Sequence, residues 1–129
     1  MAETAHYTET YKSLITLSVE GFKFSALANG GAAVALLAYL GNIAGKGAAT
    51  PDMRIPMAWF LAGLVLCGIA MFSAYLTQLF LFRESRDGAS PGGVPPNRHR
   101  RMHLSSMIAF ALSLMAFCVG SWAAVTRFT

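Results

Sequence analysis

Three long stretches without a charged residue or a histidine dominate the pattern of apolar and polar positions along this chain. They cover residues 24–45, 55–82 and 104–126, which are 22, 28 and 23 residues long. An α-helix rises about 1.5 Å per residue, so about 20 apolar residues cross the hydrocarbon core of a bilayer. The pattern therefore predicts an all-α integral membrane protein with transmembrane helices at residues 22–45, 55–82 and 104–126.

The segment before the first stretch has a helical pattern of its own. Its larger side chains recur at helical spacing, at Tyr7, Tyr11, Leu14, Ile15, Ser18 and Phe22. We predict a helix over residues 1–21, which either lies in the membrane interface as an amphipathic helix or continues into the first span as one rod. A cleavable signal peptide would begin with a short basic region, whereas Glu3 and Glu9 stand here, so we expect the first span to be retained.

The two connectors differ in composition. Residues 46–54 form a short turn, and Pro51 and Pro56 bracket the start of the second span, where proline is tolerated. Residues 83–103 are predicted to form a flexible, basic loop, because residues 87–96 are rich in glycine and proline. A flexible linker is the simpler interpretation of this loop, although its proline-rich half could also bind a cytoplasmic partner.

Composition and charge support a membrane protein and point to lipid as a partner. Only 12% of the residues are charged, against roughly a quarter in soluble domains. The net charge of +4 is concentrated directly before the third span, in residues 97–103. Such juxtamembrane clusters bind anionic lipid head groups, so we assign head-group contact to Arg98, Arg100 and Arg101 and expect no nucleic acid as a partner.

The distribution of lysine and arginine also predicts orientation. Loops rich in these residues stay in the cytoplasm, and the N-terminal segment plus the second connector carry seven of them. The first connector and the C-terminal tail carry three. We therefore expect a multi-pass protein of the cell membrane, an inner membrane in bacterial terms, with a cytoplasmic N-terminus and an external C-terminus.

Small residues follow coiled-coil spacing in all three spans. In the third span the intervals are 3, 4, 3, 4 and 3, at Ser106, Ala109, Ser113, Ala116, Gly120 and Ala123. Similar stripes are Gly21, Ser25, Ala28, Ala32 and Ala35 in the first span, and Gly63, Cys67, Ala70, Ala74 and Thr77 in the second. Close packing at small residues drives helix association in lipid, so the stripes predict a compact left-handed bundle.

The first span has a second face of small residues, which suggests contact with helices on two sides. We predict a helix-packing or oligomer interface formed by Ala26, Asn29, Gly30 and Ala33 of this face with Ala109, Ser113, Ala116 and Gly120 of the third span. Asn29 could bond across a close helix contact, or it could line a pore in an oligomer.

Residues that carry catalytic or cofactor chemistry are missing from the spans. No acidic or basic residue could form a proton relay, and no histidine could ligate haem there. Cys67 and Cys118 lie within apolar helices, and no serine in a span has a base to activate it. His99 and His103 have metal-ligand spacing, but no cysteine or carboxylate accompanies them. We predict no catalytic, cofactor or metal site and a protein that is not an enzyme.

Two function classes remain. The first is a non-enzymatic membrane protein that acts by helix–helix association, as a self-associating protein or as an accessory or scaffold subunit of a membrane assembly. The alternative is a homo-oligomeric pore or membrane-permeabilising protein, with Asn29 and its small neighbours around the opening. Such a protein would be comparable to holins in size and helix number, and no motif in the chain indicates that family.

Overall fold

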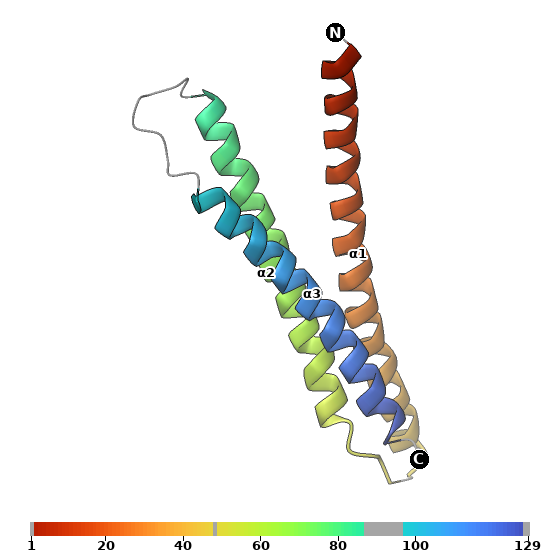
Figure 1. The fold of residues 1–129 in the computed structure, drawn as a ribbon. Coiled ribbons are helices and arrows are strands. Elements are labelled where there is room, and N and C mark those ends of the chain that lie inside the picture. The colour runs from red at the N-terminus through yellow and green to blue at the C-terminus, as the bar shows by residue number, and fades with distance from the viewer. Residues whose placement is uncertain (1, 48, 87–96, 128–129) are drawn as a thin grey trace.

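The computed structural model describes residues 2–47, 49–86 and 97–127, and within these it describes the side chains of residues 8–47, 49–80, 82 and 101–127. The described chain forms three helices, α1 (Ala2–Gly45), α2 (Arg54–Arg86) and α3 (Asn97–Val125) (Figure 1). Each helix contains a segment that is long and apolar enough to cross a membrane. These segments are Thr8–Gly45, Arg54–Phe80 and Arg101–Val125. The chain is therefore an all-helical, multi-pass membrane protein.

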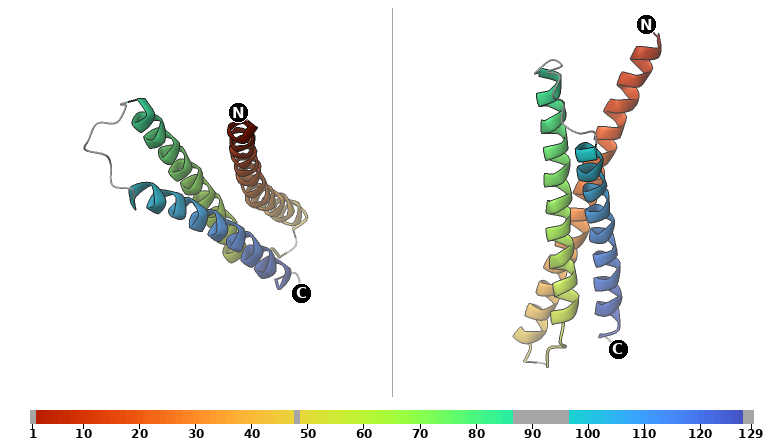
Figure 2. Two further views of the ribbon diagram at one scale, coloured as in Figure 1. Left: turned by 45° about the horizontal axis from the view of Figure 1, so that its top comes forward. Right: turned by 60° about the vertical axis from the view of Figure 1, so that its left-hand side comes forward.

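The three helices approach one another unequally. α2 and α3 run antiparallel and side by side, whereas α1 meets them near the connector of residues 46–53 and diverges from them toward its N-terminus (Figures 1 and 2). All three helices therefore pack closely only at the end of the molecule near this connector. At the other end, the N-terminal half of α1 stands away from the α2–α3 pair.

The helices extend beyond the boundaries that the sequence predicts. α1 passes through Gly21 without interruption, so residues 2–21 and the first span form one helix. Residues 83–86 complete α2, and residues 97–103 form the first two turns of α3. The predicted flexible loop over residues 83–103 is wrong for these segments, because they contain good helix formers and neither glycine nor proline. The rest of that loop, residues 87–96, lies outside the described residues.

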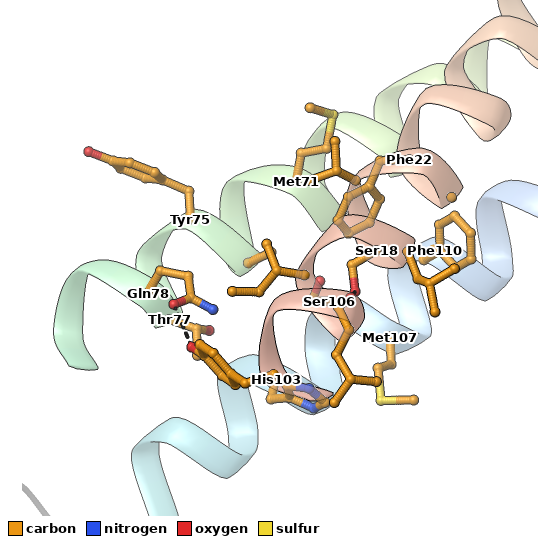
Figure 3. A pocket seen from close by; sticks show the side chains of 17 residues that line it. Ser18, Phe22, Met71, Tyr75, Thr77, Gln78, His103, Ser106, Met107 and Phe110 are labelled. Atoms are coloured by element: carbon orange, nitrogen blue, oxygen red, sulfur yellow. Dashed lines mark hydrogen bonds between the residues drawn. The ribbon is translucent and has the colours of Figure 1, made fainter. Parts of the chain in front are cut away.

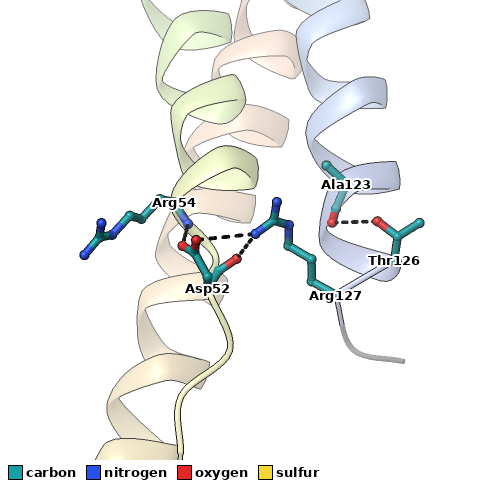
Figure 4. A network of polar contacts seen from close by, with 5 residues as sticks. All are labelled: Asp52, Arg54, Ala123, Thr126 and Arg127. Atoms are coloured by element: carbon teal, nitrogen blue, oxygen red, sulfur yellow. Dashed lines mark hydrogen bonds and ion pairs between the residues drawn. The ribbon is translucent and has the colours of Figure 1, made fainter.

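The connector of residues 46–53 is held by local contacts at both ends. α1 is followed by Gly47 with a φ of +69°, a conformation that glycine adopts at low cost, and the Gly47 N–H donates to the Ala44 carbonyl at 3.1 Å. At the start of α2, the Asp52 side chain accepts the Arg54 N–H at 3.1 Å. Arg127 also contacts Asp52, with an ion pair of 3.7 Å, and ties the end of the described chain to this connector (Figure 4).

Small residues make up the contact between α2 and α3. The buried positions on these two helices include Gly63, Cys67, Ala70 and Thr77 on α2 and Ser106, Ala109, Ser113, Ala116 and Gly120 on α3. Gly120 shows how close the backbones are, because a Cβ there would lie 2.9 Å from the Phe60 ring and 3.1 Å from the Trp59 Cβ. A cluster of buried apolar side chains, Ala33, Leu36, Met53 and Phe60, joins α1 to this pair near the connector.

Candidate functional site

Three polar side chains meet at the centre of the molecule, where the helices come together. Ser25 and Asn29 of α1 and Ser113 of α3 are each 0% exposed. The Ser25 and Ser113 hydroxyl oxygens are 2.7 Å apart. The Asn29 amide nitrogen donates to the Ser25 carbonyl at 3.0 Å and lies 3.4 Å from the Ser113 carbonyl. These contacts replace the hydrogen bonds to water that lipid cannot supply.

The hydrogen bonds of Ser113 can be assigned a direction. Its hydroxyl lies 2.7 Å from the Gly63 carbonyl of α2, and a carbonyl can only accept. The single hydroxyl proton of Ser113 is therefore donated to Gly63. Because that proton is committed, Ser25 must donate to Ser113 across the 2.7 Å contact. One hydroxyl thus links all three helices.

Asn29 of α1 packs closely against Gly63 of α2. The Asn29 Oδ1 atom is buried and has no hydrogen-bond partner in the described part of the chain. It lies against the backbone of Gly63, where an added Cβ would overlap the Asn29 amide group. Glycine at position 63 is therefore required by the space that Asn29 occupies. A buried carbonyl without a partner costs about 1–3 kcal/mol, so the surrounding contacts must offset this cost.

The other hydroxyl and thiol groups at the helix contacts also donate to backbone carbonyls. Ser106 donates to the Ala70 carbonyl at 2.9 Å, and the Cys67 thiol lies 3.4 Å from the Phe22 carbonyl. Thr77 donates within its own helix to Ser73 at 2.9 Å. Among the described residues, no cluster of three potential metal ligands occurs. The bonds of Ser106 and Cys67 each join two helices, α3 to α2 and α2 to α1.

Most of the eight predicted interface residues are buried between the helices of one copy of the chain. Five are fully buried or nearly so, and a sixth, Gly120, is buried against Phe60; these six are Asn29, Ala33, Ala109, Ser113, Ala116 and Gly120. Ala26 and Gly30 are half-buried, and the position of a Gly30 Cβ would be 3.7 Å from Leu64. These residues therefore contact helices of their own chain.

The two faces predicted for α1 do not exist as separate surfaces. The buried positions of α1 are Ser25, Asn29, Ala33 and Leu36, which combine members of both predicted faces. The buried face of α1 lies between the two predicted faces, because Asn29 fits against Gly63 and Leu36 belongs to the apolar cluster near the connector. Ala35, which the first predicted stripe included, is exposed.

A different row of small residues lies on the outer side of α1. Gly31, Ala35, Ala38 and Asn42 are spaced by 4, 3 and 4 residues, and all four are exposed. We call these four residues the outer row. At 3.6 residues per turn they lie on the side of α1 roughly opposite Asn29. Apart from its chain neighbours and the nearby backbone of α1, no atom of the described residues lies within 4 Å of where a Cβ on Gly31 would stand. The sequence contained this spacing, but it could not show which side of α1 the other two helices cover.

The basic residues before the third span are at the start of α3. Arg98 and Arg100 belong to the first turn of the helix, and their side chains lie outside the described residues. The Arg101 side chain is exposed. Head-group contact by these three arginines stays a prediction.

A cavity of about 640 Å³ separates the N-terminal half of α1 from α2 and α3 (Figure 3). Gln78, Thr77 and His103 lie at one end, and Phe22, Met71 and Phe110 lie at the other. The Tyr11 hydroxyl donates to the Gln78 side chain at 3.2 Å and bridges the first end. Sequence reasoning missed this cavity, because it depends on the divergence of α1 and not on a local motif.

Comparison with known proteins gave no match to a family model, a curated protein or a solved structure.

Proposed function

We propose that this chain is a small non-enzymatic membrane protein that acts by helix–helix association, either with further copies of itself or as an accessory subunit of a larger membrane assembly. In this proposal it lies in the cell membrane with its N-terminus in the cytoplasm and its C-terminus outside. The residues that could associate are those of the outer row of α1, because the other small-residue faces are used within the chain.

The observation that carries the proposal is the exposure of the outer row. Gly31, Ala35 and Ala38 present little side chain, so another helix could approach the α1 backbone closely. Asn42 places an exposed amide on the same side, and amides hydrogen-bond across helices in lipid. Gly41 and Gly45, which flank Asn42, also have open space around them.

The experiment is to place leucine in the outer row. We expect Gly31→Leu and Ala35→Leu to abolish higher-mass species when the protein is extracted in a mild detergent and the intact assembly is weighed. Ala62→Leu on α2 and Ala111→Leu on α3 are matched controls, because both positions are exposed and lie outside the outer row. An unchanged assembly in the outer-row variants, or equal loss in the controls, would refute the proposed interface.

The pore alternative receives no support from the position of Asn29. This residue is 0% exposed among three helices of one chain, so it can line an opening between copies only if α1 leaves its place. Helix association therefore remains the better proposal. Leakage of dye from liposomes that contain the purified protein, with no leakage from empty liposomes, would reverse this choice.

A further inference from the structure

The cavity beside α1 is an open groove, and a side-chain contact joins α1 to another helix at each of its ends. At one end is the hydrogen bond from Tyr11 to Gln78, and at the other the Phe22 and Phe110 rings meet edge to face, with centroids 5.4 Å apart. Tyr11 and Phe22 are eleven residues apart on α1, which corresponds to about 16 Å along the helix. The cavity volume of about 640 Å³ lies within the range of roughly 300–1,000 Å³ that is typical of ligand sites.

Polarity changes along the length of this cavity. Tyr11, Gln78, Thr77 and His103 put hydroxyl, amide and imidazole groups at the first end. The rest of the lining is mainly apolar and includes Leu14, Ile15, Met71, Met107, Phe22 and Phe110. The hydroxyls of Ser18 and Ser106 also belong to it (Figure 3). A molecule that fits this gradient has a polar group at one end and a hydrocarbon part at least several carbons long.

The shape of the cavity favours an acyl chain over another helix. A helix with its side chains is about 10–12 Å across, and one lying along the cavity would have to break both the Tyr11–Gln78 and the Phe22–Phe110 contacts. An acyl chain is slimmer and flexible, and it can fill the space while both contacts persist. If the cavity were empty, the side chains that line it would lose dispersion contacts. Acyl chains surround a transmembrane segment, so one of them can supply these contacts.

Charge at the polar end favours an anionic head group. The last turn of α2, residues 83–86, and the first turn of α3, residues 97–101, continue the helices beyond this end and carry five arginines and one glutamate. Arg100 is three residues before His103, so helical register puts both residues on the same side of α3. On α1, the lysines nearest the cavity are paired with acids of their own helix, Lys12 with Glu9 at 3.4 Å and Lys23 with Glu20 at 2.8 Å. The net positive charge at this end therefore comes from α2 and α3.

We propose that the cavity is a binding site for one anionic phospholipid of the bilayer, with an acyl chain between α1 and the α2–α3 pair and the phosphate at the His103 end of α3. The site is independent of the proposed association, because the outer row lies on the other side of α1. Loss of either one leaves the other intact.

The test uses the full chain in nanodiscs, with phosphatidylglycerol or phosphatidylcholine that carries a photoreactive group in its acyl chain. We expect phosphatidylglycerol to label Met71 and Met107 above exposed positions outside the cavity, such as Leu61 and Val65. Even labelling of all four positions, or equal labelling of the cavity by both lipids, would overturn the proposal. A cross-link from Met107 to a second protein copy in place of lipid would also overturn it.

Paired variants separate the cavity from the bilayer surface around it. Ser18→Phe fills the cavity from α1 and Ala74→Phe fills it from α2, and either variant should remove the preferential labelling. Ala62→Phe, at an exposed position outside the cavity, should leave it unchanged. Arg100→Gln should lower the preference for phosphatidylglycerol about fivefold, the effect of one basic residue near an anionic surface. Arg101→Gln removes the same charge from a position roughly opposite His103 on α3 and should lower the preference less; equal effects would contradict the site.

Discussion

At the scale of single residues, the contact between the three helices depends on the hydroxyl of Ser113. It donates to Gly63 of α2 and accepts from Ser25 of α1. Interhelical hydrogen bonds in membranes contribute about 0.6 kcal/mol each on average. We therefore expect Ser113→Ala to lower the free energy of unfolding by about 1–2 kcal/mol, measured by detergent-induced unfolding followed by circular dichroism. Ser105→Ala is the control, because Ser105 is exposed and bonds only to Met102 of its own helix. Equal losses would show that Ser113 has no special role.

Glycine at position 63 supports the same meeting point by leaving room for Asn29. Gly63→Ala would force the Asn29 amide to move, and overpacking of this kind costs about 1–3 kcal/mol. Gly68→Ala is matched to it, since Gly68 is on the same helix with open space around it, and helix propensity should make that change neutral or stabilising by less than about 1 kcal/mol. The two variants are compared by the same unfolding measurement. A Gly63→Ala protein as stable as Gly68→Ala would contradict the close approach of α1 and α2.

At the scale of helices, the two halves of α1 differ in how far the other two helices bury their side chains. Residues 25–36 contain its buried positions, whereas in residues 8–18 the side chains are exposed and Tyr11 reaches α2 through Gln78. We expect backbone amides of residues 8–18 to exchange with deuterium faster than those of residues 25–36. Tyr11→Phe should raise the exchange rate of the first group about fivefold, the factor for loss of a hydrogen bond of ~1 kcal/mol, and leave the second group unchanged. A uniform exchange rate along α1 would show that its N-terminal half is held as firmly as the rest.

The three helices also differ in how much of their packing could be predicted from the sequence. The spans followed from charge alone, because ionisable side chains are costly in hydrocarbon. The stripes of α2 and α3 could be read directly, since each of these helices has one row of small residues and a close neighbour in sequence. α1 has small residues on several sides, so its sequence could not tell which row meets Gly63 and which faces outward. The Asn29–Ser113 contact was beyond reach for the same reason: it joins residues 84 positions apart through a rotation of α1 that no local pattern fixes.

For the whole molecule, the proposed orientation in the membrane is based on seven basic residues on the predicted cytoplasmic side against three on the other side. Replacing Arg98, Arg100 and Arg101 by glutamine would leave four basic residues on the predicted cytoplasmic side and three on the other side. Because this difference is small, we expect a mixed population with both orientations. C-terminal fusions to alkaline phosphatase, which is active outside the cytoplasm, and to green fluorescent protein, which reports a cytoplasmic location, measure the two populations. The unmodified chain should give phosphatase activity alone. Persistent single orientation in the triple variant would show that the N-terminal segment sets topology by itself.

The distance in sequence between Asn29 and Ser113 has a consequence for how the protein is made. Translation adds about 5–20 residues per second, so the 84 residues between them take about 4 to 17 s to synthesise. During that interval the ribosome has delivered Asn29 to the membrane, but the acceptor in α3 does not yet exist. The newly inserted first helix must therefore be tolerated by the insertion machinery while the Asn29 amide has only the Ser25 carbonyl of its own helix as a partner, and the contact is completed when α3 has been synthesised.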